Sequence, residues 1–395
     1  MRRSGTFELR LHPGRAPSWL VSRMKPLSQA IMTAIWMDKG PDEIIRRLSD
    51  PVWFQALSNV LGYDWDSSGS TTVTSSVVKD VLNGMEVGVR GAGGKGRRSR
   101  FAPAEIEETC ELPAFSRADP AKLTYASRMA AKVDTCAIQA GYQIYHHVFY
   151  FTQSGSWTVV QQGMNPKLKS ARRYHWTDEN LKSFVVEPHT GIVGDVVLDS
   201  VLDMTAHESD DARKVSVDLV AESPLSLKRH LTTVRAQHQN SLTDWLPLQG
   251  DDARRFFKVA VESRVNWEAL AAAYELKPGD YEQLLHVKGM GPGTVRALAM
   301  VAEVVYDAKV GRRDPVKYSF SFGGKDGIPY PVNRRRMDEV TTMLMDALDR
   351  ARIGDAERLK AIRRLTSLTR SMGLKESGAG SDAHGGTVTA GRHSL

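Results

Sequence analysis

Paired polar residues recur in the segment 146–195, where a purely structural sheet would carry mostly apolar side chains. The pairs are His146-His147, Gln161-Gln162 and Arg172-Arg173. Histidine can act as a general acid, a general base or a metal ligand, and arginine can hold a phosphate through two parallel hydrogen bonds. We therefore predict a catalytic centre here, joined by one lysine from an upstream glycine-rich loop. Its predicted members are His147, Gln162, Arg172, Arg173, His175 and Lys95.

Acidic residues and a further histidine make up a candidate metal site, namely Asp64, Asp66, Glu187 and His189. Such ligands hold Mg²⁺ or Mn²⁺ in enzymes that hydrolyse phosphodiesters, so one of these two ions is the expected cofactor. A nucleotide is not expected, because the Gly-Lys pair that ends at Lys95 is followed by Gly96, where a P-loop needs Ser or Thr. No organic cofactor is expected either.

Glycine-rich residues 288–294 predict a turn between two helices. An apolar stripe that ends at Val287 resumes at helical spacing from Val295. This pattern is typical of a helix-hairpin-helix, in which backbone N–H groups at the start of the second helix bind a phosphate without reading a base. The predicted DNA-binding residues of this motif are Lys288, Gly289, Gly291, Gly293 and Thr294.

Two basic, glycine-rich loops, 88–100 and 317–331, accompany this motif. The first contains five Lys or Arg residues and no acid, and the second repeats its Gly-Gly-Lys core. Cations neutralise phosphates, and glycines let the backbone approach them. The predicted DNA-binding residues of the loops are Arg97, Arg98, Arg100 and Lys325. The net charge of +7 agrees with a polyanionic partner, and RNA is an alternative that the sequence leaves open.

Periodicity predicts helices over 21–60, 75–83 and 120–139, and a β-hairpin with strands at 145–152 and 156–162. Segments 192–204 and 214–220 are further strand candidates, and 225–310 is predicted to be helical. We therefore expect an α+β fold with a small antiparallel sheet, followed by a mainly helical region that carries the helix-hairpin-helix. The predicted divisions are 1–223 for a mixed catalytic or DNA-processing domain, 224–310 for the helical domain, 311–372 for a basic loop and helical tail, and 373–395 for a disordered tail.

Composition narrows the class of protein. Hydrophobic residues make up 41% and charged residues 25% of the chain, which is typical of a globular protein. The two cysteines, Cys110 and Cys136, form no CxxC pattern, which disfavours a thiolate zinc site and favours a reducing compartment. No apolar run approaches the roughly 20 residues that span a bilayer, and the N-terminus lacks the apolar segment of a signal peptide. We expect a cytoplasmic protein without a membrane partner, and whether it forms a homodimer is left open.

Several longer motifs resemble the domain-of-unknown-function 763 family, namely FQAL at 54–57, GAGGKG at 91–96, YASRMAAKVD at 125–134, QQGMN at 161–165 and ARRYHW at 171–176. Residues 2–5 and 323–327 match as well, so the resemblance covers about residues 1–350. Two positions depart from the family pattern, with Asp66 in place of a usual His and Ala140 in place of a usual Asp. If either position is catalytic in the family, the resemblance implies altered activity in this chain.

Three functions fit these observations. The first, which we expect, is a metal-dependent nuclease of DNA repair or recombination that binds single-stranded, duplex or branched DNA without sequence preference. The second is a non-catalytic adaptor that binds unusual DNA structures and needs only the basic loops and the hairpin. The third is a DNA glycosylase or lyase, because hairpin motifs also occur in base-flipping proteins and Lys288 and Asp307 flank the second helix of the motif.

Overall fold

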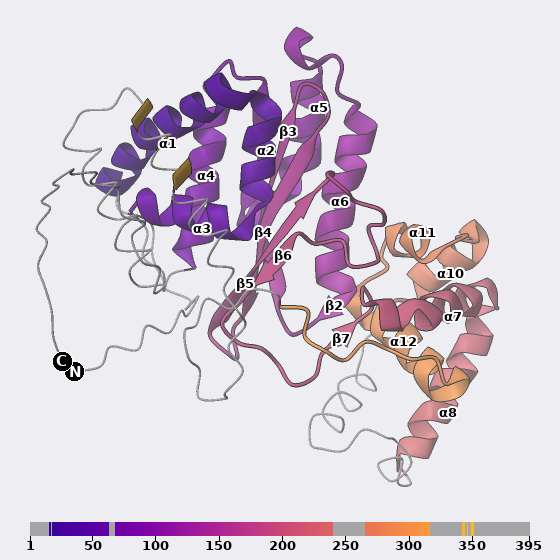
Figure 1. The fold of residues 1–395 in the computed structure, drawn as a ribbon. Coiled ribbons are helices and arrows are strands. Elements are labelled where there is room, and N and C mark those ends of the chain that lie inside the picture. The colour runs from indigo at the N-terminus through magenta and orange to yellow at the C-terminus, as the bar shows by residue number, and fades with distance from the viewer. Residues whose placement is uncertain are drawn as a thin grey trace, which may run out of the picture.

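A central antiparallel sheet organises the fold (Figure 1). The computed structural model describes residue 16, residues 18–62, 68–239 and 265–316, and five positions between 342 and 350. Within them, five strands lie in the order β1-β3-β4-β5-β6. Their bounds are Val89–Lys95 for β1, Gln143–Thr152 for β3, Trp157–Asn165 for β4, Ser170–Thr177 for β5 and Gly191–Val193 for β6. A separate two-stranded pair joins β2, Ile138–Gln139, to β7, Leu202–Asp203.

The hairpin predicted at 145–162 is confirmed as β3 and β4. The loop predicted at 88–100 is wrong, because residues 89–95 form β1 and Gly96–Phe101 forms a 3-10 helix. One glycine of this segment, Gly93, serves close packing between strands rather than a loop. A Cβ atom at Gly93 would lie 2.3 Å from the backbone oxygen of His147 on the neighbouring strand, so only glycine allows β1 to lie this close to β3.

Four helices cover one face of the sheet, namely α1 Ser18–Lys39, α2 Pro41–Ser49, α3 Pro51–Val60 and α4 Gly69–Asn83. Their apolar side chains form one buried cluster with Val148, Tyr150 and Val160 of the sheet. Asp50 begins α3 as an N-cap, because its carboxylate accepts hydrogen bonds from the backbone N–H groups of Val52 and Trp53. The helices predicted in 21–60 and 75–83 are thus confirmed.

Two helices, α5 Ala102–Cys110 and α6 Pro120–Cys136, cover the opposite face of the sheet. The side chain of Asp119 caps α6 by accepting from the backbone N–H groups of Ala121 and Lys122, and Pro120 occupies the first helical position, where its missing N–H costs nothing. The helix predicted at 120–139 is confirmed up to Cys136, after which the chain enters β2.

The remaining helices lie to one side of α6, at the lower right of Figure 1. They are α7 Asp210–Ala221, α8 Pro224–Gln239, α10 Trp267–Leu276, α11 Tyr281–His286 and α12 Pro292–Tyr306. The strand predicted at 214–220 is wrong, because the segment belongs to α7. Its alternating valines suggested a strand, but Ala212, Ser216 and Leu219 share a buried helical face. The strand predicted at 192–204 forms only at its two ends, as β6 and β7.

The α+β fold expected from the sequence is therefore confirmed. The larger buried cluster includes Met129 of α6, Leu219 of α7 and Leu298 of α12. It thus contains residues from both sides of the predicted division at 223 and 224, and that division stays a prediction. Most of 311–372 and all of 373–395 lie outside the described residues. None of the helices that the structure describes is long and apolar enough to cross a membrane.

Candidate functional site

The sheet separates the predicted catalytic residues onto its two faces. Cross-strand pairing forms two neighbouring rows, His146-Gln162-Arg173 and His147-Gln161-Tyr174. Because successive residues of a strand point to opposite faces, the first row faces α1 to α4 and the second faces α6. On each face of the sheet, a histidine therefore lies beside a glutamine. His147, however, lies on the opposite face from Gln162 and Arg173.

Arg173 and His175 are both 0% exposed. Arg173 donates hydrogen bonds to Gln55 Oε1 at 3.0 Å and to the Pro51 carbonyl at 3.3 Å, and burial lowers its pKa to about 9. His175 Nδ1 lies 3.1 Å from the Leu48 carbonyl, to which it donates, and burial lowers its pKa well below the usual value. These side chains hold α2 and α3 against the sheet. They have no exposed surface through which the predicted contact with DNA would act.

Arg172 forms an ion pair with Asp314, and both side chains are fully buried. Arg172 also donates to the Val196 carbonyl at 3.1 Å and lies 4.3 Å over the ring of Tyr142. Asp314 accepts a second hydrogen bond from the Leu198 backbone N–H at 2.8 Å. The pair therefore joins β5 to the segment that follows α12, and in this structure the charge of Arg172 is compensated inside the protein.

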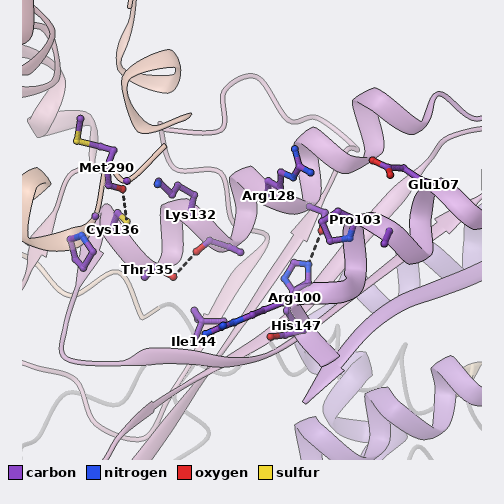
Figure 2. A pocket seen from close by; sticks show the side chains of 17 residues that line it. Arg100, Pro103, Glu107, Arg128, Lys132, Thr135, Cys136, Ile144, His147 and Met290 are labelled. Carbon is purple, nitrogen blue, oxygen red and sulfur yellow. Dashed lines mark hydrogen bonds between the residues drawn. The ribbon is translucent and has the colours of Figure 1, made fainter. Parts of the chain in front are cut away.

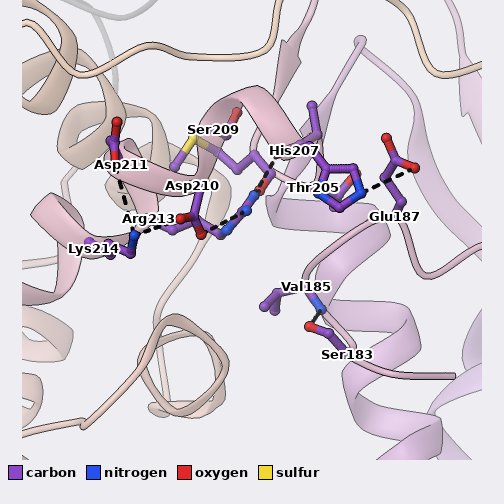
Figure 3. Close-up of polar contacts among 12 residues, drawn as sticks. Ser183, Val185, Glu187, Thr205, His207, Ser209, Asp210, Asp211, Arg213 and Lys214 are labelled. Atoms are coloured by element: carbon purple, nitrogen blue, oxygen red, sulfur yellow. Dashed lines mark hydrogen bonds and ion pairs between the residues drawn. The ribbon is translucent and has the colours of Figure 1, made fainter.

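Two of the four predicted metal ligands, Glu187 and His189, line a cavity of about 290 Å³. His189 Nε2 donates to the Asp134 carboxylate at 2.5 Å, whereas the exposed Glu187 carboxylate lies 3.8 Å from His207 Nε2 (Figure 3). The other two candidates, Asp64 and Asp66, lie outside the described residues. In the part of the chain that is described, no three His, Cys, Asp or Glu side chains gather as a group able to hold a metal ion. The metal site stays a prediction.

A larger cavity, with a volume of about 820 Å³, lies between α5, α6, β3 and the turn before α12 (Figure 2). We call it the α6 pocket. Two elements that the sequence assigned to DNA meet in it, because Ser99 and Arg100 come from the basic segment and residues 289–292 come from the hairpin. Helix α6 forms the wall between them and contributes Arg128 and Lys132, among other residues.

Hydrogen bonds hold the start of α12 against β2, the short strand that follows α6. Gln139 Nε2 donates to the Pro292 carbonyl at 2.9 Å, and Arg296 Nε donates to Gln139 Oε1 at 2.7 Å. Within the turn, Gly289 has a φ of +85°, and a Cβ atom there would lie 2.8 Å from Asn266 Nδ2, so the turn requires glycine. A helix, a turn and a second helix thus lie where the sequence predicted them. That they form a helix-hairpin-helix motif, and that they bind DNA, both stay predictions.

Three cations, Arg100, Arg128 and Lys132, bring positive charge to the α6 pocket. Arg100 and Arg128 are exposed and Lys132 is half-buried, and burial lowers the pKa of Lys132. Glu107 also lines the pocket but makes no ion pair with them, and within the described ranges none of the three is paired with a carboxylate. Their charges are therefore available to an anionic ligand.

The other predicted DNA-binding residues are spread around the pocket or away from it. Lys95, Arg97 and Arg98 are exposed just before the pocket-lining Ser99, and Lys95 lies 5.9 Å over the ring of Tyr145. Further along the chain, Lys288 is exposed and Gly293 is partly exposed, while Thr294 is buried and accepts from the Asn266 backbone N–H at 2.9 Å. Lys325 lies outside the described residues.

A chain of hydrogen bonds runs inward from the α6 pocket. Ser127 Oγ and His147 Nε2 are 2.9 Å apart, and both residues line the pocket. His147 Nδ1 lies 2.8 Å from Gln161 Oε1, and Gln161 Nε2 donates to the Asp134 carboxylate. The pocket therefore contains a hydroxyl group bonded to a histidine whose second nitrogen is itself oriented, which is an arrangement that can activate a nucleophile.

One protein-family model matches most of the chain. A family model described as a protein of unknown function, DUF763, matches residues 5–332. The chain belongs to the DUF763 family. No curated protein and no solved structure matches it. The resemblance seen in the sequence is thus confirmed, and the family description assigns no activity.

Sequence reasoning missed three pocket residues of this DUF763 protein, namely Ser127, Arg128 and Lys132. A signal for them was present in α6. Its pocket-lining positions, 127, 128, 131, 132, 135 and 136, recur at helical spacing and carry small or polar side chains, while Met129, Ala130 and Val133 face the core. A polar stripe on a helix is usually only a solvated face. The sequence could not show that the turn before α12 lies across the pocket from the polar stripe of α6.

Proposed function

We propose that this DUF763 protein binds the sugar-phosphate backbone of DNA in the α6 pocket. The observation that carries the proposal is the meeting of Arg100, Arg128 and Lys132 with the hairpin turn around one cavity of about 820 Å³. These residues come from three parts of the chain that are far apart in sequence. Cations without a carboxylate partner in the described residues are available to neutralise phosphates, and this electrostatic attraction dominates non-specific binding of DNA.

The start of α12 adds a second feature suited to a phosphate. The N-cap of α12 is Gly291, and no side chain caps this end of the helix. The first backbone N–H groups of a helix lack partners within the helix, and they carry the positive end of its dipole. Because Gly291 and Pro292 line the α6 pocket, the helix end and the three cations favour the same anionic ligand.

Contacts of this kind recognise the backbone rather than base edges, so the expected binding is independent of sequence. Such binding suits DNA repair or recombination, and it accommodates single-stranded, duplex or branched DNA. RNA carries the same phosphates and is the alternative ligand. An adaptor needs these contacts alone, whereas a metal-dependent nuclease also needs ligands for Mg²⁺ or Mn²⁺, of which Asp64 and Asp66 lie outside the described residues.

The test is the salt dependence of DNA binding. Labelled single-stranded, duplex and branched DNA are titrated with the full chain in EDTA, Mg²⁺ or Mn²⁺, at salt concentrations between about 50 and 200 mM. For duplex DNA, the logarithm of the affinity should fall with the logarithm of salt by about 0.9 per neutralised phosphate. Replacing Arg100, Arg128 and Lys132 together by Ala should make this slope shallower by about 2 to 3 and weaken binding at least about ten-fold at low salt.

A matched control replaces three exposed lysines that do not line the pocket, namely Lys39, Lys182 and Lys228. It changes the net charge by the same amount and should leave the slope nearly unchanged. If the two triple variants lost affinity and salt dependence equally, the overall charge of the protein, rather than the pocket, would account for DNA binding. A wild-type chain that shows no salt-sensitive binding to any of the nucleic acids would contradict the proposal outright.

A further inference from the structure

The protonation of His147 is fixed by the orientation of Gln161. Gln161 Nε2 donates to the Ala130 carbonyl at 3.0 Å and to the Asp134 carboxylate, so Oε1 is the atom that faces His147 Nδ1. An amide oxygen only accepts hydrogen bonds, and Nδ1 therefore carries the hydrogen. His147 Nε2 is left as an acceptor, and the hydroxyl of Ser127 donates to it across 2.9 Å.

Asp134 anchors the inner end of this chain. Its carboxylate is 0% exposed and also accepts hydrogen bonds from Trp176 Nε1 at 3.0 Å and from His189 Nε2. Burial lowers the pKa of His147, while the hydrogen bond with Gln161 and the charge of Asp134 act in the opposite direction. His147 is thus neutral at rest, and a proton that it accepts is stabilised by the dipole of Gln161 and the nearby carboxylate.

We propose that Ser127 is the nucleophile and His147 the general base of a phosphodiester cleavage in the α6 pocket. The substrate is the DNA backbone that the proposed function places there, so this inference rests on that function. The roles follow from position, because both side chains line the pocket and the hydroxyl already donates to the base. In the buried serine of α7, Ser216, the hydroxyl instead donates to the Ala212 carbonyl of its own helix.

The reaction proceeds in two balanced steps. In the first, Ser127 Oγ attacks the phosphorus, its proton passes to His147 Nε2, and the bond from phosphorus to one sugar oxygen breaks. That oxygen, which departs on the side opposite Ser127 Oγ, takes a proton from water, and His147 gives its proton up to water, which leaves a phosphodiester between Ser127 and one DNA end. In the second, water attacks the phosphorus from that opposite side and gives up a proton to the solvent, the bond to Ser127 Oγ breaks, and the serine takes a proton from the solvent through His147. Water is the co-reactant, and nothing is oxidised or reduced.

The cations of the pocket fit the charge changes of these steps. As the phosphorus gains a fifth bond, negative charge accumulates on its non-bridging oxygens. Arg100, Arg128 and Lys132 line the same cavity as Ser127 and His147, so they can stabilise this charge while they hold the backbone. One set of side chains thereby binds the substrate and favours its transition state.

The experiment detects the covalent intermediate directly. The full chain is incubated in EDTA with labelled single-stranded, duplex and branched DNA, each carrying one bridging phosphorothiolate linkage at either the 3′ or the 5′ side. The thiol that leaves is a poor nucleophile for the reverse step, so a phosphoserine intermediate accumulates. Labelled protein is then sought on a denaturing gel, and the modified peptide is located by mass spectrometry. Cleavage and DNA binding are measured in parallel.

The wild-type chain should form an adduct at Ser127 and cleave DNA in EDTA. Ser127→Ala should lose the adduct and at least about 10³-fold of the cleavage rate while it binds DNA with unchanged affinity. His147→Gln should likewise lose the adduct and the cleavage while it keeps its affinity for DNA. Thermal unfolding of each variant checks that the chain is folded. Ser216→Ala removes a buried helical hydroxyl outside the pocket, and it should leave both adduct and cleavage intact.

The opposing outcomes separate the two proposals. Salt-sensitive binding by the wild-type chain without an adduct or cleavage in EDTA would overturn the catalytic inference and leave backbone binding standing. Cleavage that Ser127→Ala retains would overturn it as well. If the wild-type chain bound none of the substrates, the proposed function itself would fail, and the roles inferred for Ser127 and His147 would fall with it.

Discussion

At the scale of single residues, three imidazole groups of the sheet are almost fully buried. His146 and His175 are 0% exposed and His147 is 2% exposed, and burial is the largest cause of the lowered pKa of each. Histidine is usually the side chain that changes charge near neutral pH. Here burial favours the neutral form of all three at pH 7 as long as the chain stays folded.

This burial predicts a loss of stability in acid. Burial, with smaller electrostatic contributions from Lys95, Lys79 and the protonated form of His147, lowers the pKa of His146 from 6.5 to about 3. The unfolded chain therefore binds a proton at this position between those two values, whereas the folded chain does not. Above pH 6.5 His146 is neutral in both states and does not change the free energy of unfolding. As the pH falls below 6.5, protonation stabilises the unfolded chain, so at pH 5 the free energy of unfolding should be lower by about 2 kcal/mol from this residue alone.

Urea unfolding at pH 7 and at pH 5 measures this effect. His146→Asn should show a pH-dependent loss that is smaller than the wild-type loss by about 2 kcal/mol. His207, whose side chain is 76% exposed, provides the control, and His207→Asn should lose as much stability as the wild type. An identical pH dependence in His146→Asn and the wild type would show that His146 is protonated in the folded chain.

At the scale of elements, α6 is the helix that joins the sheet to the hairpin. It packs on β3 and β4 through residues such as Met129 and Val133. On another side, Tyr125 donates to the Glu282 carboxylate of α11 at 2.6 Å, and Cys136 lies below the turn, with its Sγ atom 3.7 Å from the Met290 backbone oxygen. A single helix thus positions the hydroxyl, the cations and the hairpin turn relative to one another.

Two neighbouring glycines of the hairpin turn should respond differently to substitution. Gly289→Ala introduces a Cβ atom at a φ of +85° and only 2.8 Å from Asn266 Nδ2. It should lower stability by at least about 1–2 kcal/mol and weaken DNA binding, because the turn must move. Gly291 has a φ of −109°, and its nearest atom would be 3.8 Å from a new Cβ. Gly291→Ala should therefore cost less stability than Gly289→Ala, and what it costs should come from the poorer N-cap that alanine makes.

Thermal unfolding of the two variants checks this contrast, and DNA titration of Gly289→Ala checks the expected loss of binding. Gly291→Ala is the control for adding a methyl group to the turn, since it differs from Gly289→Ala chiefly in backbone conformation. Equal stability of both variants would mean that the turn does not depend on the left-handed conformation of Gly289.

At the scale of the whole molecule, one buried cluster continues from the sheet through α6 to α7 and α12. The helices that follow residue 223 contribute Leu284, Val295 and Leu298 to this cluster. In addition, the buried pair of Arg172 and Asp314 ties β5 to the chain beyond α12. The helices that follow residue 223 therefore complete the hydrophobic core of residues 1–223.

We expect, on this basis, that a chain truncated after residue 223 is much less stable than the full chain. The truncation exposes apolar surface of α6 and α7 and leaves Arg172 buried without Asp314, and the loss of one partner of a buried ion pair alone costs about 3–5 kcal/mol. Circular dichroism and tryptophan fluorescence, followed together during heating, should give one transition for the full chain and a lower or absent transition for the truncated one. A truncated chain that unfolds at the temperature of the full chain would instead support an independent domain at 1–223.

The sequence by itself determined the local elements and the family of this protein. The β3–β4 hairpin, the helices at 21–60 and 120–136, and the glycine turn before α12 follow from periodicity, capping and turn chemistry, which act over a few residues. Local patterns failed where a distant neighbour decided the outcome. Gly93 is in a strand because the backbone of His147 lies against it, and 214–220 is helical because one side of α7 is buried.

Only the tertiary structure decided which polar residues share a site. A strand turns each successive residue to the opposite face, so the neighbours His146 and His147 are separated by the sheet, and Arg173 is directed into the interior beneath α3. Ser127, Arg128 and the hairpin turn meet because α6 packs between the sheet and α11. Burial, charge pairing and proximity between distant segments arise from packing of the whole chain, and no pattern along the sequence encodes them.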